Sequence, residues 1–156
     1  MPDPDGGPGV PDGAPLHDAP PPVEPVLLET LTIDVSVQSP ISSAVVLAAG
    51  HTYQLIASGE AIVRDDDLGR FEGDADYWYN GTFFGDRAGD VDMGLAVNDF
   101  DGDDSRAPNW GDFNDSHVYQ ATVAGNDAVL TAQFFDPDFG NGNSGSLTLE
   151  IWGPPP

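Results

Sequence analysis

The chain contains no cysteine and no lysine, and its only basic residues are four arginines. The absence of cysteine excludes disulfides, thiolate metal ligands and a cysteine nucleophile. Against the four arginines stand 27 acidic residues, which give the 156-residue chain a formal net charge of -23. Phosphate backbones and anionic lipid surfaces repel such a charge, so we expect no nucleic acid among the partners.

Long apolar runs are also missing. No stretch approaches the roughly 18 to 20 apolar residues of a membrane-spanning helix, which predicts no membrane insertion. Met1 is followed by Pro, Asp and Gly, and not by the basic and then apolar segments of a signal peptide. We therefore expect either a cytosolic protein or an exported one whose leader is not in this sequence. We favour the second, with an extracellular or cell-surface location.

Residues 1–25 hold nine of the fifteen prolines and five acids, with almost nothing apolar to bury. Such a composition cannot offset the entropy lost on ordering, so we expect a disordered or extended tether. From residue 26 the sequence changes to β-branched and aromatic residues in short alternating runs. A single β domain is therefore predicted over 26–153.

The alternation predicts about nine strands and no helix, arranged as an antiparallel β-sandwich or jelly roll. In "ETLTIDVSV", for example, Leu31, Ile33, Val35 and Val37 fall on one face, as a half-buried strand requires. The stretch Gly125-Asn126-Asp127 is interpreted as a hairpin turn. Residues 64–76 and 98–116 are predicted to be long irregular loops with a function, because they are too long for simple turns.

The segment "FFDPDFGNGNSGSLTLEI", residues 134–151, places hard oxygen side chains among glycines just before an alternating strand. Ca²⁺ takes six to eight oxygen ligands from carboxylates, amides and backbone carbonyls. Asp136, Asp138, Asn141 and Asn143 are therefore predicted calcium ligands. The alternative is an Asx-rich turn whose side chains cap their own backbone without an ion.

This segment resembles the end of the small, soluble, calcium-dependent galactophilic lectins of bacteria. In that family a strand delivers an Asp, a loop of Gly and Asn follows, and Asn-Ser-Gly-Ser opens the last strand. Upstream, "VVLAAGHTYQLIASG" is similar to the family's opening β segment. The resemblance implies a galactose-binding-like β-sandwich in which Asp136, Asn143 and Asn141 hold Ca²⁺ and the ion coordinates sugar hydroxyls. Gly142 interrupts the family's paired Asn, and its Thr ligand has no counterpart here.

Two further acidic clusters are metal candidates. Asp74 and Asp76 lie two apart before the aromatic run Tyr77-Trp78-Tyr79, so both can face the same way and meet the C-terminal loop. We take Asp76 as a possible direct ligand of the ion. The second cluster, "NDFDGDDS" at 98–105, alternates acids like the start of an EF-hand loop. It lacks that loop's glycine position, closing Glu and flanking helices, which leaves a looser calcium site or a solvated acidic loop.

Aromatic rings beside acids suit sugars, because a ring face covers the C–H side of a pyranose while oxygens accept from its hydroxyls. Trp110, Tyr77, Asp74 and Asp112 are the predicted ligand-binding residues. Trp110 is expected to be exposed, in the loop "RAPNWGDFNDSH". The alternative for Trp110 is a plug for one end of the sandwich, and strand aromatics in general are more often core residues.

The sequence thus favours an exported calcium-binding β-sandwich that recognises carbohydrate. We do not expect an enzyme, because His51 and His117 lie outside any nucleophile motif. One alternative is a calcium-stabilised structural subunit of an extracellular assembly, whose N-terminal arm contacts a neighbour. That role would require a homo-oligomer, which the sequence leaves open. Another alternative is an ion-free spacer.

Overall fold

The computed structural model describes residues 23–81, 84–86, 93–98, 108–137 and 139–155. Within these residues the chain is all-β, and none of them forms a helix that could cross a bilayer. The eleven strands are β1 (Val26–Asp34), β2 (Ile41–Leu47), β3 (Thr52–Ser58), β4 (Ala61–Asp66), β5 (Gly69–Gly73), β6 (Tyr77–Tyr79), β7 (Phe84–Asp86), β8 (Gly94–Val97), β9 (Val118–Ala124), β10 (Ala128–Phe135) and β11 (Ser146–Gly153).

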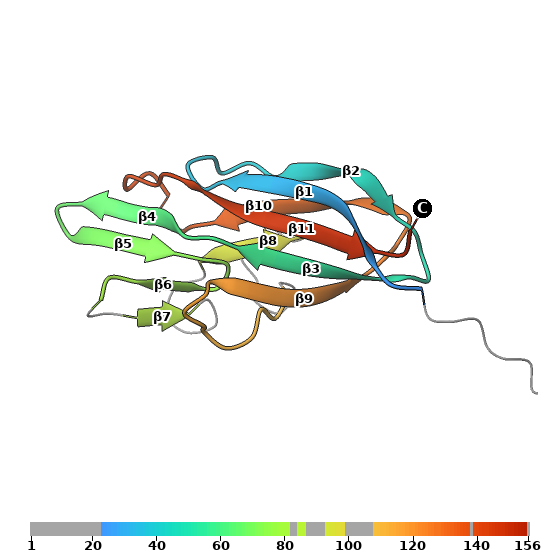
Figure 1. The fold of residues 1–156 in the computed structure, drawn as a ribbon. Helices are drawn as coiled ribbons and strands as arrows, with labels where there is room; N and C mark the ends of the chain where they lie inside the picture. Colours follow the sequence, from blue (N-terminus) through green and yellow to red (C-terminus); the bar gives the residue numbers. More distant parts are fainter. Residues whose placement is uncertain (1–22, 82–83, 87–92, 99–107, 138, 156) are drawn as a thin grey trace, which may run out of the picture.

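The strands form three antiparallel sheets, consistent with a β-sandwich. Sheet A has the order β1-β11-β3-β9, sheet B the order β2-β10-β8, and sheet C the order β4-β5-β6-β7. In Figure 1 the strands of sheet A lie side by side, and the β4–β5 hairpin projects beyond the end of β3. The sandwich predicted from the sequence is therefore confirmed, whereas the jelly-roll strand order stays a prediction. Residues 1–22 lie outside the described residues, and β1 begins at Val26, where the β domain was expected to start.

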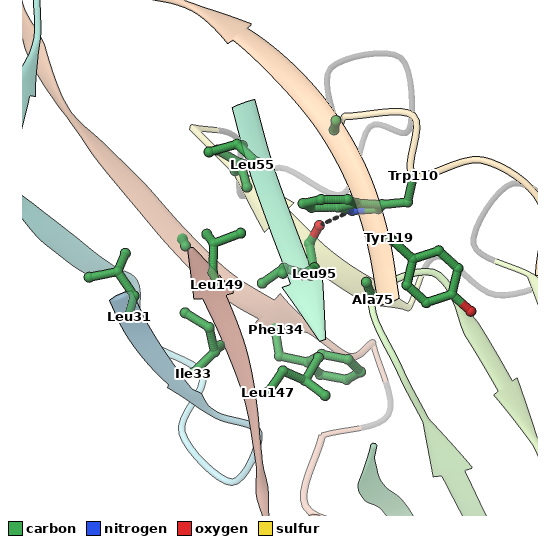
Figure 2. Close-up of a cluster of buried hydrophobic side chains, with 14 of the residues drawn as sticks. Leu31, Ile33, Leu55, Ala75, Leu95, Trp110, Tyr119, Phe134, Leu147 and Leu149 are labelled. Carbon is green, nitrogen blue, oxygen red and sulfur yellow. Dashed lines mark hydrogen bonds between the residues drawn. The ribbon is translucent and has the colours of Figure 1, made fainter. Parts of the chain in front are cut away.

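The core forms because each strand of sheet A turns alternate apolar side chains inward. On β11, Leu147, Leu149 and Ile151 are buried while the residues between them are not. They meet apolar residues of sheet B, including Leu95 and Phe134, in one cluster (Figure 2). Burying each such side chain stabilises the fold by about 1.5–3 kcal/mol.

Two sequence predictions about loops are wrong. Residues 64–76 do not form a long irregular loop, because β4 and β5 pair as a hairpin through this stretch. Gly69, with a φ of 122°, lets the chain reverse there. The stretch 125–127 does not close a hairpin either. Strand β9 pairs with β3 in sheet A and β10 pairs with β2 and β8 in sheet B, so this turn crosses between sheets.

The turn at 125–127 crosses because its backbone is held by the neighbouring turn, between β2 and β3. The N–H of Gly125 donates to the carbonyl of His51, and the N–H groups of Asn126 and Asp127 donate to the carbonyl of Leu47. A Cβ at residue 125 would lie 2.0 Å from the carbonyl oxygen of Ala48, so only glycine allows this approach. The two sheet-crossing turns therefore pack as one unit at this end of the sandwich.

The carboxylate of Glu29 joins the edges of sheets A and B. Its oxygens accept from the N–H groups of Ala44 at 2.9 and 3.0 Å and of Val45 at 3.0 Å. We expect Glu29→Ala to lower the free energy of unfolding by about 1–3 kcal/mol, because two backbone donors lose their acceptor. Urea unfolding measures this loss, with Glu24→Ala, an exposed acid, as the control. Equal stability of the two variants would contradict the assignment.

Candidate functional site

The C-terminal loop between β10 and β11 is held against two separate segments. The Gln38 amide donates to the carbonyl of Asp136 at 2.7 Å, and the N–H of Asp65 donates to the carbonyl of Asn141 at 2.8 Å. Gly142, with a φ of 94°, permits the second contact, because a Cβ there would lie 2.8 Å from the Asp65 carbonyl oxygen. The loop is thus a fixed structure that positions its side chains.

Within this loop the structure brings Asp136 and Asn143 together. Asp136 is only 1% exposed, although it directly follows the last residue of β10. Its Oδ2 accepts from Nδ2 of Asn143 at 2.7 Å, and the same Nδ2 lies 3.4 Å from the carbonyl oxygen of Val35. Three oxygen-bearing groups from the end of β1, the end of β10 and the approach to β11 therefore meet at one point.

The other atom of this amide, Asn143 Oδ1, is buried without a hydrogen-bond partner in the described structure. A buried unpaired oxygen costs about 1–3 kcal/mol, which makes it an unusual feature. Amide N and O atoms are interchangeable by rotation of the side chain. Turning the amide over would aim Oδ1 at the Asp136 carboxylate, where a cation could be held by both oxygens, and would move Nδ2 to the position that Oδ1 now occupies. These groups fit the hard oxygen ligands that Ca²⁺ requires.

The other predicted metal ligands do not join this pair in the same way. Asn141 contributes its backbone carbonyl to the Asp65 N–H, and Asp138 lies outside the described residues. Asp76 is half-buried, and its N–H donates to Asp74. Over the described ranges, no three His, Asp or Glu side chains form a group suited to a metal. The acids at 99–105 lie outside those ranges.

The prediction that Trp110 is an exposed platform is wrong. Trp110 is 3% exposed, and its indole N–H donates to the carbonyl of Leu95 at 3.0 Å (Figure 2). It packs in the core cluster and so closes the sandwich, which was the alternative role. A tryptophan in a polar loop can be buried when the loop folds back over the end of two sheets.

Asp74 was predicted to touch a ligand, but its side chain is 0% exposed. Its Oδ1 accepts from the N–H groups of Asp76 at 3.0 Å and Tyr77 at 2.9 Å. Its Oδ2 accepts from the Tyr119 hydroxyl at 2.6 Å and contacts Nδ1 of His117 at 2.9 Å. With this many donors the carboxylate is stable in the core, so Asp74 positions other groups and does not reach a ligand.

The His117 ring extends this network to the surface. Its Nε2 lies 3.3 Å from Oε1 of Glu60, and the Tyr79 hydroxyl donates to the same carboxylate. The Tyr79 ring stacks on the imidazole with centroids 5.6 Å apart. His117 has a φ of 51°, unusual for a residue with a Cβ, and its backbone is held by Asn114 and Gly59.

Glu60 also lines an open hollow of about 320 Å³ next to the C-terminal loop. Its walls are formed by Glu60, Ala61, Ile62, Arg70, Glu72, Ser144 and Gly145. Arg70 and Glu72 form an ion pair at 3.4 Å, exposed and therefore weak. The hollow presents carboxylates, a guanidinium and a hydroxyl.

Of the remaining predicted ligand-binding residues, Tyr77 is packed among other rings and Asp112 is exposed. Tyr77 stacks on Tyr119 and meets the edge of Phe113, and its hydroxyl donates to the Gly111 carbonyl. Its ring is thus packed between other rings. Asp112 is exposed in the loop before β9.

Sequence reasoning missed the roles of His117, Glu60 and Tyr119. The only local signal was that His117 directly precedes β9, which puts it at the same strand end as the buried Tyr119. No motif spacing connects residues 60, 74 and 117, because the three come together only through sheet pairing.

Comparisons with protein-family models, with curated proteins and with solved structures found no match.

Tyr119→Phe tests the Asp74 network. We expect a loss of about 1–3 kcal/mol in the free energy of unfolding, because the buried carboxylate loses one donor. Tyr77→Phe is the matched control, since its hydroxyl donates to an exposed loop carbonyl. Chemical denaturation measures both variants, and a loss no larger than that of Tyr77→Phe would contradict the network's importance.

The same network predicts sensitivity to alkali. Burial, followed by the hydrogen bonds to Asp74 and Glu60, raises the pKa values of Tyr119 and Tyr79 well above the ordinary 10.0. Neutral phenols then contribute stability that is complete below pH 10 and is lost as the pH rises beyond it. Ultraviolet titration of the folded chain should show fewer tyrosines ionising near pH 10 than in guanidinium chloride. Identical titration curves would rule this out.

Proposed function

We propose that this chain is an exported calcium-binding β-sandwich that recognises carbohydrate. The observation that carries the calcium part is the buried, unpartnered Oδ1 of Asn143 beside the buried Asp136 carboxylate. Asp136, Asn143 and the carbonyl of Val35 would hold the ion, whose charge would balance the carboxylate and join the ends of three strands. In the absence of an ion, the Asn143 amide takes that place as a weaker, uncharged partner.

The small number of fixed ligands favours weak affinity. Extracellular calcium modules bind with dissociation constants on the order of 10⁻⁴ to 10⁻³ M, and such a site fills only where calcium is abundant. This supports an extracellular or cell-surface location. It also gives the net charge of -23 a natural counter-ion.

The burial of the site decides what the ion would do. Asp136 is 1% exposed and Asn143 Oδ1 has no accessible surface, so an ion held between them is shielded from a large ligand. Its main effect would be to stabilise the loop and the hollow beside Ser144. Direct coordination of sugar hydroxyls, which the lectin resemblance implies, would require the loop to open. Carbohydrate contact is therefore better sought on a surface that is already accessible.

Calcium should raise the melting temperature. A ligand that binds only the folded chain at a hundred times its dissociation constant adds about 2.7 kcal/mol, which for a domain of this size is roughly 5–10 °C. We expect Asp136→Asn to abolish the shift and Asp112→Asn, which removes the same charge from an exposed loop, to retain it. Thermal melts with calcium, magnesium and chelator provide the measurement. A melting temperature that does not change with calcium would contradict the calcium site and favour an ion-free sandwich.

A further inference from the structure

We propose that the outer face of sheet A binds a neutral polysaccharide, with Trp152 as its principal contact. The inference rests on the carbohydrate part of the proposed function and does not depend on calcium. Outer face here means the side chains that three adjacent strands turn away from the core. They are Ser146, Thr148, Glu150 and Trp152 on β11, Thr52, Gln54, Ile56 and Ser58 on β3, and Val118, Gln120, Thr122 and Ala124 on β9.

The outer face carries little charge in a strongly acidic chain. Of its twelve side chains only Glu150 is ionisable, and its Oε2 accepts from the Trp152 indole N–H at 2.8 Å. An acidic ligand would find no cation there, and a basic one would be drawn to the acid-rich loops instead. Its three aliphatic residues, Ile56, Val118 and Ala124, are too few for an apolar protein interface. Hydroxyl and amide groups dominate, which suits a neutral, hydroxyl-rich ligand.

Trp152 lies in a hollow on this face. The hollow has a volume of about 350 Å³ and is lined by Val23, Pro25, His51, Thr52, Gln54, Thr122, Trp152, Gly153 and Pro154. The hydrogen bond to Glu150 fixes the ring, so little rotamer entropy is lost when a sugar packs on it. An aromatic ring with amide, hydroxyl and imidazole groups around it is the combination that recognises pyranose rings.

The strand register places hydrogen-bonding groups in line with Trp152. Trp152 pairs with Gln54, and Gln54 pairs with Thr122, so the three cross the sheet in one row. Gln120 lies in the next row, where it pairs with Ile56. The side-chain Nε2 of Gln54 donates to Oε1 of Gln120 at 2.9 Å. This contact fixes both side-chain amides and leaves Oε1 of Gln54 and the Nε2 N–H groups of Gln120 to bind hydroxyls.

The face is long enough for a chain of sugars. Strand residues rise about 3.3 Å each, so Trp152 and Thr148 on β11 are roughly 13 Å apart, with Gln54 and Ser58 opposite them on β3. In Figure 1 the strands β11, β3 and β9 lie side by side. The binding energy would come from Trp152, and the rows of Thr and Gln would set the direction of the chain.

The test is affinity electrophoresis in gels containing soluble galactomannan, β-glucan, xylan or dextran, together with pull-down on insoluble cellulose and chitin. We expect wild type to bind at least one of these and Trp152→Ala to weaken that binding roughly tenfold or more. Thr122→Arg, which places a long side chain across the hollow, should do the same without disturbing the core. Phe139→Ala is the control, since Phe139 is 40% exposed but belongs to the C-terminal loop.

Each binding measurement is made with calcium and with chelator, which separates the two proposals. Binding that survives chelator but is lost in Trp152→Ala and Thr122→Arg supports the outer face. Binding that is lost with chelator and in Asp136→Asn, yet kept in both face variants, overturns the outer face and leaves the proposed function standing. Failure of wild type to bind any polysaccharide overturns this inference, while the calcium melts still decide the ion. Should Trp152→Ala misfold by circular dichroism, Thr122→Arg decides the outcome.

Discussion

A buried carboxylate requires a compensating charge or hydrogen-bond donors, and this requirement explains the surroundings of both Asp74 and Asp136. Asp74 and Asp136 are among the most buried side chains in a chain whose net charge is -23. Transferring an ionised carboxylate from water into protein is costly unless it is paired or hydrogen-bonded. For Asp74 the protein supplies two backbone N–H groups, a phenol and an imidazole. Beside Asp136 the Asn143 amide donates to the carboxylate and leaves its own Oδ1 buried without a partner in the described structure, and this unpartnered oxygen is what makes the loop a candidate ion site.

The Asp74 network also explains how an acid-rich chain holds its sheets together. Asp74 precedes β6, and its contacts with His117 and Tyr119 connect sheet C to sheet A. His117 then faces Glu60, which lies in the bend between β3 and β4. Carboxylates that would otherwise repel each other thus become linked through one ring. Glu60 also borders the hollow near Ser144. The position of this wall of the hollow therefore depends on the buried Asp74, through His117.

Much of the fold could be predicted because apolar and polar residues alternate along a strand with a period of two. The alternation identified Leu31 and Ile33 as inward-facing residues of β1, and both are buried. The predicted strand 29–37 nevertheless lies three residues later than β1 (Val26–Asp34), and Val37, expected on the inner face, is 48% exposed. Alternation says which face a residue occupies but not which strand lies beside it. The turn at 125–127 therefore looked like a hairpin, although its backbone donors bind the β2–β3 turn and carry the chain into the other sheet.

The candidate site could be predicted only where its residues lie close together in the sequence. Asp136 and Asn143 flank one loop, so their meeting needed only a local reversal rich in glycine. The direction of Asp74 and Trp110 depended on contacts distant in sequence, with Tyr119 and Leu95 respectively. A polar loop sequence is the same whether its tryptophan faces solvent or the core. Local pattern could therefore propose these residues for a site but not decide which way they point.

Strand β11 links the two proposed sites while keeping them apart. Asn143 lies just before this strand, and Trp152 is its second-last residue. The end of β11 lies near the C-terminus (Figure 1). At about 3.3 Å per residue, Ser146 and Trp152 are separated by roughly 20 Å, too far for one ion to touch a ligand on the indole ring. An ion at Asp136 can still act on the outer face by holding the entry of β11 in register between β1 and β3. Calcium would then govern the stability of the surface, and the chemistry of Trp152, Gln54 and Thr122 would govern what binds there.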